Sequence, residues 1–312
     1  MSDQFLPQAS SFASAAVRMA TPLALAGLGE AWSERSGLLN IGLEAIMLTG
    51  AFCGFMVANI TGSLALGILA GIAGGMAISL IHAFLSVTCK ADQTIAGLAL
   101  NFFASGITSY AFLMRFGKTT TLAKCPMVSV FPIPLLCDIP FIGPILFRQS
   151  AFVYAAFIAV AVSALVFRRT EWGTSLAAAG ENPRAADSAG LSVAKIRYTA
   201  AAVNGLLGGL AGAYLTLGSL GFFMENVTSG RGYIALVVVI LGRRAPLGVL
   251  FAALLLGAVD ALQFRVQTLG IAIPSQVFIM FPYVATVAVL LFSFGKNRDP
   301  GALGQPFDRG RR

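Results

Sequence analysis

Apolar residues form long runs along this chain, and short polar or glycine-rich segments separate them. Most runs hold about 20 residues, the length of an α-helix that crosses about 30 Å of hydrocarbon. They lack the short alternating pattern of a membrane β-barrel strand. The pattern therefore predicts an all-α, polytopic transmembrane helical bundle with full spans at 11–30, 38–58, 63–86, 94–115, 149–168, 195–218, 246–264 and 274–293.

A further apolar stretch, residues 230–242, is too short to cross the bilayer as a straight helix. At a rise of about 1.5 Å per residue, a helix of this length covers only about 20 Å. We expect a discontinuous helix there, before Pro246 begins the next span. The elements predict about eight or nine spans in a single transmembrane domain over residues 1–295.

Composition supports a membrane protein, because 57% of the residues are hydrophobic and only 11% are charged. The net charge of +8 would suit a nucleic-acid partner in a soluble protein. In a membrane protein, however, Lys and Arg mark the cytoplasmic side. Fourteen basic residues fall on one set of loops with the C-terminal tail, and six fall on the other set. We therefore expect the lipid bilayer rather than nucleic acid as the surroundings, with the C-terminus inside and the N-terminus outside.

This orientation assigns the polar segments to sides of the membrane. Residues 116–148 form an external loop, 169–194 a cytoplasmic loop, and 296–312 a basic cytoplasmic tail. Cys125 and Cys137 share the external loop, where a disulfide between them stays an open question. The spacing of Cys and His indicates no metal site, and we expect no cofactor.

The cytoplasmic loop carries the signals of a short helix. Asn182 is suited to cap its start, Pro183 to occupy its first position, and Gly190 to end it. The sequence therefore predicts about two helical turns over residues 183–189. Such a helix outside the bilayer is suited to docking against another protein, although an ordinary solvated connector fits the residues as well.

Three segments carry a resemblance to a known family. The pattern of Gly180, Asn182, Pro183, Ala185, Ala186 and Gly190 resembles the cytoplasmic coupling loop of bacterial ABC-transporter permeases that import ribose-type sugars, nucleosides and branched-chain amino acids. The stretch SERSGLLNIGLEAIMLTGAF, residues 33–52, is similar to the simple-sugar and nucleoside subgroup. Residues 230–263 resemble a third family segment.

The resemblance implies a permease subunit of the bacterial inner membrane that is not itself an enzyme. Its implied partners are a second, related permease in a heterodimer, cytoplasmic ATP-binding subunits and an extracytoplasmic substrate-binding lipoprotein. It also implies that the ATP-binding subunits dock on the loop residues Gly180, Glu181, Asn182, Pro183, Arg184, Ala185 and Ala186.

Glu44 is the leading candidate for the solute pathway, because a carboxylate within a span is costly and is often functional. Asn40 precedes it by four residues and would share its helix face. In the alternative interpretation, Glu44 ties helices together by pairing with Arg18 or with the backbone of residues 36 and 37.

Further pathway candidates are mostly neutral. Polar groups without charge suit the hydroxyls and base edges of a neutral solute, and an aromatic ring can stack on a sugar or a nucleobase. These candidates are Asn101, Phe102, Asn204, Met224 and Arg231. They predict a pathway for a neutral polar solute, and the resemblance implies that this solute is a nucleoside or a simple sugar.

Other functions remain as alternatives. A permease for branched-chain amino acids would have the same architecture, and a proton-coupled secondary transporter would use Glu44 as its proton carrier. A lipid-modifying enzyme would need a nucleophile with a base or a metal cluster, which the single histidine and scattered carboxylates do not indicate. The stretch GKTT, residues 117–120, lacks the preceding glycine of a phosphate-binding loop. We find no internal sequence repeat.

Overall fold

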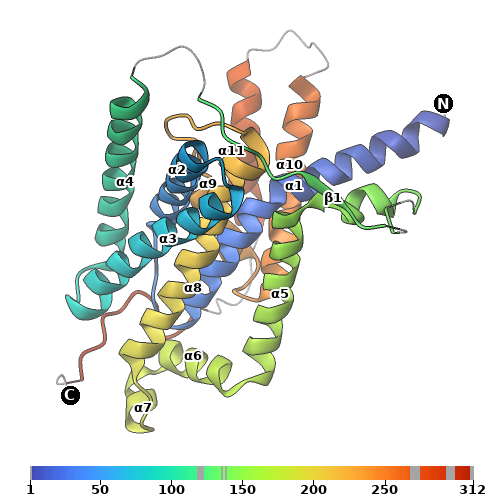
Figure 1. Ribbon diagram of the computed structural model, residues 1–312. Coiled ribbons are helices and arrows are strands. Elements are labelled where there is room, and N and C mark those ends of the chain that lie inside the picture. Colours follow the sequence, from blue (N-terminus) through green and yellow to red (C-terminus); the bar gives the residue numbers. More distant parts are fainter. Residues whose placement is uncertain are drawn as a thin grey trace.

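The computed structural model describes residues 2–117, 123–134, 136, 137, 139–267, 275–292 and 299–309. They form a helical bundle with a small two-stranded hairpin (Figure 1). The α-helices are α1 (Ser2–Arg35), α2 (Leu43–Thr61), α3 (Leu64–Ala83), α4 (Gln93–Phe116), α5 (Ala151–Arg169), α6 (Glu171–Glu181), α7 (Pro183–Ser188), α8 (Val193–Ala213), α9 (Arg231–Leu241), α10 (Pro246–Gln267) and α11 (Ser275–Phe292). Wider π-helical turns η1 (Phe84–Thr88) and η3 (Tyr214–Leu220) extend α3 and α8, and a third, η2 (Gly143–Phe147), lies in the predicted external loop.

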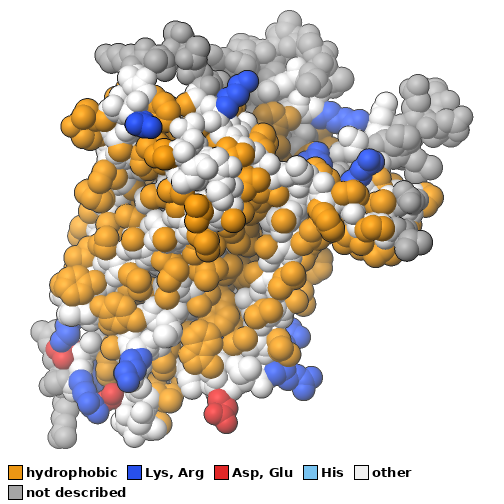
Figure 2. Space-filling model, viewed as in Figure 1, with side chains coloured by type: hydrophobic (Ala, Val, Ile, Leu, Met, Phe, Trp, Pro, Cys, Tyr) orange, Lys and Arg blue, Asp and Glu red, His pale blue; other side chains and the backbone are white. Residues whose placement is uncertain are grey.

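Seven helices within the described residues are long and apolar enough to cross a membrane, which confirms the predicted bundle. They cover 8–35, 43–61, 64–88, 93–116, 151–169, 193–220 and 246–267, and α11 lies at the remaining predicted span. Figure 2 shows hydrophobic side chains over the middle of one face, with Lys and Arg towards both ends. This distribution is the one that a bilayer requires.

The first and last parts of the chain repeat one order of elements. Each begins with a membrane helix of 28 residues, Gln8–Arg35 or Val193–Leu220. Each then has a non-helical linker, followed by a helix that starts inside the bundle, α2 or α9, and by two further helices. By the predicted orientation, the two long helices cross in opposite directions, so the repeat is inverted, as in many transporters. Its packing is also reciprocal, because α1 packs against α10 as α8 packs against α3.

The linker after α1 corrects the predicted span 38–58. Residues 38–42 are not helical, and α2 begins only at Leu43. Within a bilayer, the unpaired amides of such a linker need partners. Gln93 Oε1 accepts from the Leu39 amide at 2.7 Å, and Glu30 Oε1 accepts from the Asn40 amide at 2.9 Å. The polar stretch 33–36, which begins like an exposed turn in the sequence, is almost entirely buried.

The prediction of a discontinuous helix at 230–242 is confirmed. Helix α9 has only 11 residues and follows a series of turns, which begins after η3 and ends at Gly230 with φ of 76°. A further turn joins α9 to α10, whose first residue is Pro246. This part of the bundle therefore consists of an irregular segment up to Gly230 and the short helix α9 after it.

The predicted cytoplasmic side carries α6 and α7, which lie together at the lower end in Figure 1. The short helix is confirmed over Pro183–Ser188: Asn182 Oδ1 accepts from the Ala185 amide at 3.0 Å. Helix α6 before it was not predicted. Residues 299–309 of the predicted tail pack against this region, because the Ala302 amide donates to the Gly180 carbonyl at 2.9 Å.

The predicted external loop holds a two-stranded antiparallel hairpin, β1 (Val130–Pro132) with β2 (Arg148–Ser150). Among the residues that the structure describes, Cys125 and Cys137 are not joined by a disulfide. Of the GKTT stretch, residues 118–120 lie outside the described part of the chain.

Candidate solute pathway

Glu44 lies where the two interrupted elements meet, in the first turn of α2 and beside the start of α9. Its Oε1 accepts from the Thr228 hydroxyl and from the Gly230 amide at 2.9 Å, and its Oε2 accepts from the Gly232 amide at 2.7 Å. The carboxylate thus receives donors at the N-terminus of α9, where the helix dipole favours negative charge.

These contacts answer the question of what Glu44 binds within the protein. Neither suggested partner is used: Arg18 donates to Ser14, and the donors to Glu44 come from residues 228–232. The close approach depends on Gly232, because a Cβ placed there would lie 2.5 Å from Glu44 Cα. A side chain larger than hydrogen would push α9 away from α2.

An open cavity of about 320 Å³ lies beside this junction. Asn101 of α4 forms part of its wall and fixes the start of α2: its Oδ1 accepts from the Ala45 amide, and its Nδ2 donates to the Tyr233 hydroxyl. The adjacent Phe102 is 79% exposed, so its ring is available to an external molecule. The lining is polar and aromatic, with Glu44, Leu48, Asn101, Phe102, Ser105, Asn226, Ser229, Gly230, Tyr233 and Tyr283.

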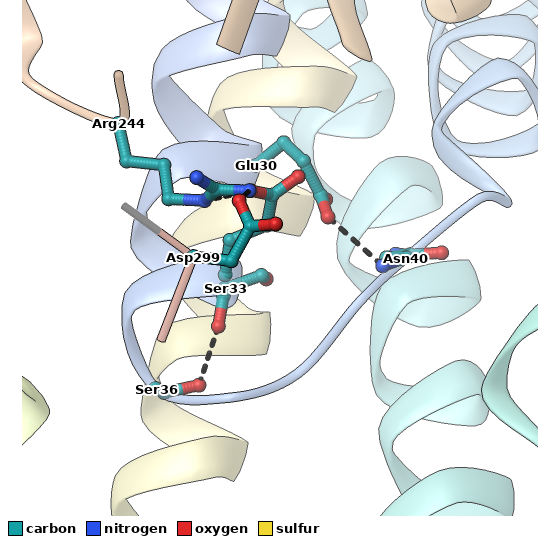
Figure 3. Close-up of polar contacts among 7 residues, drawn as sticks. Glu30, Ser33, Ser36, Asn40, Arg244 and Asp299 are labelled. Carbon is teal, nitrogen blue, oxygen red and sulfur yellow. Dashed lines mark hydrogen bonds and ion pairs between the residues drawn. The ribbon is translucent and has the colours of Figure 1, made fainter. Parts of the chain in front are cut away.

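Two predicted pathway residues, Asn40 and Asn204, lie away from this cavity. Asn40 precedes α2, so the expectation that it shares a helix face with Glu44 was wrong. Both asparagines instead bind Glu30, a fully buried carboxylate of α1. Its Oε1 accepts from the Asn40 amide, as Figure 3 shows, and its Oε2 accepts from Asn204 Nδ2 at 2.7 Å.

An ion-pair cluster continues from Glu30 towards the predicted cytoplasmic side (Figure 3). Arg244, in the turn between α9 and α10, pairs with Glu34 of α1 and with Asp299 of the tail. Sequence reasoning missed Glu30 and Glu34, because the predicted span 11–30 ends at Glu30 and leaves Glu34 in an exposed turn between two spans. Their spacing of four residues on a helix with a long apolar run was the available signal.

The remaining pathway candidates lie near the cavity without lining it. Met224 is 49% exposed in the turns before α9. Arg231, at the first position of α9, lines a second and smaller cavity of about 120 Å³. The structure therefore brings Glu44, Asn101 and Phe102 together and separates the other candidates.

The docking candidates divide into packed and exposed residues. Gly180 is buried against the backbone of Arg35 and Gly37, and Ala186 is the buried residue of α7. Glu181 Oε2 accepts from the Gly301 amide of the tail at 3.2 Å. The exposed side chains of α7 include Arg184 and Ala185, whereas Asn182 and Pro183 set its start.

Residues 12–290 match the family described as the permease component of branched-chain amino acid transport systems. The chain belongs to this permease family. It is also 36% identical to the permease TsgC13 of Haloferax volcanii, whose name gives glucose as its solute, over 96% of this chain and 98% of that protein.

Two further relatives of this permease come from Bacillus subtilis. It is 36% identical to the guanosine ABC transporter permease NupQ over 94% of this chain and 95% of that protein. It is 27% identical to the guanosine ABC transporter permease NupP over 92% of this chain and 84% of that protein.

One solved structure, an ABC transporter in an inward-facing conformation, resembles the permease with a TM-score of 0.54 and 17% identity. The similarity covers 91% of this chain and 85% of that one, and it supports the fold. The permease is thus a multi-pass ABC transport subunit rather than an enzyme.

Proposed function

We propose that this permease forms part of the translocation pathway of an ABC importer for nucleosides or simple sugars. The observation that carries the proposal is the polar and aromatic cavity at the junction of α2 and α9. The relatives named for guanosine and glucose support this solute class over branched-chain amino acids.

The chemistry of the cavity suits a neutral solute. Among the described residues of its lining only Glu44 is charged, and this carboxylate already accepts three hydrogen bonds from residues 228–232. Ser105 and Tyr233 offer neutral hydroxyl groups, which match the hydroxyls and base edges of a solute, whereas both N–H donors of Asn101 are used within the protein. The rings of Phe102 and Tyr283 can stack on a nucleobase or on the apolar face of a sugar.

The importer needs partners that this chain does not supply. We assign the docking of the ATP-binding subunits to helix α7. Its residues Arg184 and Ala185 are exposed to a partner, while the buried Ala186 packs the helix against the rest of the permease. The tail connects this site to the membrane, since Arg309 pairs with Asp187 of α7 and Asp299 pairs with Arg244. ATP-driven movement of α7 would therefore reach the turn that follows α9.

A second, related permease completes the pathway in this proposal. Bacillus subtilis has two different permeases, NupQ and NupP, that are both named for guanosine, which supports a heterodimer. An extracytoplasmic binding protein would deliver the solute to the predicted outer side. Affinity for the solute would then lie mainly in that protein, and the cavity would hold the solute only in passage.

Uptake of labelled solutes by a deletion strain tests this function. We expect the strain to lose accumulation of guanosine or glucose and to regain it with a plasmid copy. Loss of leucine uptake alone would favour the branched-chain alternative. Uptake that collapses with the proton gradient but survives inactivation of the ATP-binding subunits would refute an ABC importer.

A further inference from the structure

The smaller cavity, of about 120 Å³, lies between the start of α9 and helices α10 and α11. It adjoins the Glu44 cavity, because Ser229 and Tyr283 line both. The Tyr283 hydroxyl donates to the Ser229 carbonyl at 2.6 Å, so these two residues lie together at the boundary that the cavities share. The full lining is Ser229, Arg231, Ile234, Asp260, Gln263, Phe264, Pro282 and Tyr283.

Two buried polar side chains of α10 in this cavity have no hydrogen-bond partner among the residues that the structure describes. Asp260 is 6% exposed and Gln263 is 8% exposed, and within the described residues neither makes a hydrogen bond or an ion pair. Arg231 lines the same cavity and attracts Asp260 electrostatically, yet the two form no ion pair in the described part of the chain. Unpaired polar groups inside a membrane protein are costly, so this arrangement indicates a site that a polar molecule fills.

We propose that this cavity is a subsite for the vicinal hydroxyls of a ribose or hexose ring. The two carboxylate oxygens of Asp260 accept from adjacent hydroxyls, the contact by which an acidic residue holds a ribose in dinucleotide sites. Gln263 and Arg231 donate to the hydroxyl oxygens. The rest of the solute extends past Tyr283 into the Glu44 cavity, against the ring of Phe102.

This inference rests on the proposed function and adds residues to it that recognise the solute. A free cation is a poorer occupant, because the guanidinium of Arg231 lies in the same small cavity and repels it. A zwitterionic amino acid would match the two opposite charges, and its uptake is therefore one arm of the test.

The test uses Asp260→Asn, which keeps the shape of the side chain and removes its charge. Glu225→Gln is the matched control, because Glu225 is exposed and lines neither cavity. Cells with the complete importer receive labelled guanosine, 2′,3′-dideoxyguanosine or leucine, and uptake rates are compared at equal amounts of membrane-inserted permease. The ratio of the guanosine uptake rate to the dideoxyguanosine uptake rate measures the contribution of the ribose hydroxyls to uptake. The binding protein also prefers one of the two solutes, but this preference is the same for variant and wild type, so the comparison of their ratios removes it.

We expect Asp260→Asn to lower this ratio by about 10-fold, since a hydrogen bond to a charged group is worth about one order of magnitude or more. Gln263→Leu should lower it several-fold, and Glu225→Gln should leave it unchanged. If the Asp260→Asn permease does not insert into the membrane, the guanosine-to-dideoxyguanosine ratio of the Gln263→Leu permease tests the subsite instead. Where wild type takes up glucose instead, glucose and 2-deoxyglucose replace the two nucleosides.

An unchanged ratio in well-inserted Asp260→Asn and Gln263→Leu permeases would overturn the subsite. Selective loss of leucine uptake in Asp260→Asn would also overturn it, in favour of a zwitterion. If wild type accumulates neither guanosine nor glucose, the proposed function itself fails and this inference fails with it. That outcome is recognisable without any variant.

Discussion

Glu44→Gln tests the central junction of the permease, where the carboxylate accepts from Thr228, Gly230 and Gly232. Glutamine keeps one carbonyl oxygen and replaces the other with an NH₂ group, which cannot accept from an amide. At least one donor at the start of α9 therefore loses its acceptor. The charge that complements the helix dipole disappears as well.

The expected loss of stability follows from these contacts. A hydrogen bond to a charged group contributes about 1.5–3 kcal/mol, and a charge at a helix N-terminus contributes about 0.3–1 kcal/mol. Loss of one such bond and of the dipole contact should lower the free energy of unfolding by about 2–4 kcal/mol. The measurement is unfolding of the purified permease by SDS in mixed micelles, with the exposed Glu225→Gln as control.

Uptake by the same variant separates the two roles of Glu44. If stability falls while uptake per folded permease is unchanged, Glu44 holds α9 in place without contacting the solute. A decrease in uptake beyond the decrease in folded protein supports a place in the pathway. A change in unfolding free energy below about 0.5 kcal/mol would refute the capping argument, because that is the effect of an ordinary surface substitution.

Three other predictions concern the cytoplasmic side and the external loop. Replacing both Arg184 and Ala185 with Glu should uncouple ATP hydrolysis from uptake at normal membrane levels, and wild-type uptake would rule out docking at α7. Arg244→Met leaves the buried Glu34 carboxylate unpaired and should lower the free energy of unfolding by about 3–5 kcal/mol. Adding Glu34→Gln should recover much of that loss in the same SDS titration, and a double variant as unstable as the single one would contradict the ion-pair argument. Burial raises the pKa of the Cys125 thiol, so its thiolate fraction at pH 7 is lower than that of an exposed cysteine. In a single-cysteine permease, an impermeant maleimide should therefore label Cys125 slowly at pH 7 and faster as the pH rises, and fast labelling at pH 7 would contradict its burial.

The inverted repeat shows where sequence reasoning reached its limit. The interrupted helix at 230–242 was predictable, because its length is a local property of the chain. Its counterpart at 36–42 was not, since Leu38 and Leu39 continue into the apolar run of α2 and look like part of a full span. The interruption is possible because two side chains accept from the linker amides: Glu30, near the end of the preceding helix, and Gln93, which is distant in sequence.

Asp260 shows the same limit at the level of a site. A single carboxylate near the end of a span gives no signal that distinguishes it from an ordinary residue at the membrane surface. Its burial beside Arg231 depends on how α9, α10 and α11 pack. Asn204 shows the converse, because its amide group donates to Glu30 and Ser33 of α1 in a buried cluster that the sequence did not reveal.

The sequence by itself determined the membrane class, most of the spans and the short helix after Asn182, and it made Glu44 a candidate, because hydropathy, capping and the cost of a buried charge act over a few neighbouring residues. Only the tertiary structure decided what Glu44 binds: its partner Thr228 lies 184 positions away along the chain. No local pattern encodes such a contact, since it exists only when two helices start at the same point inside the bundle.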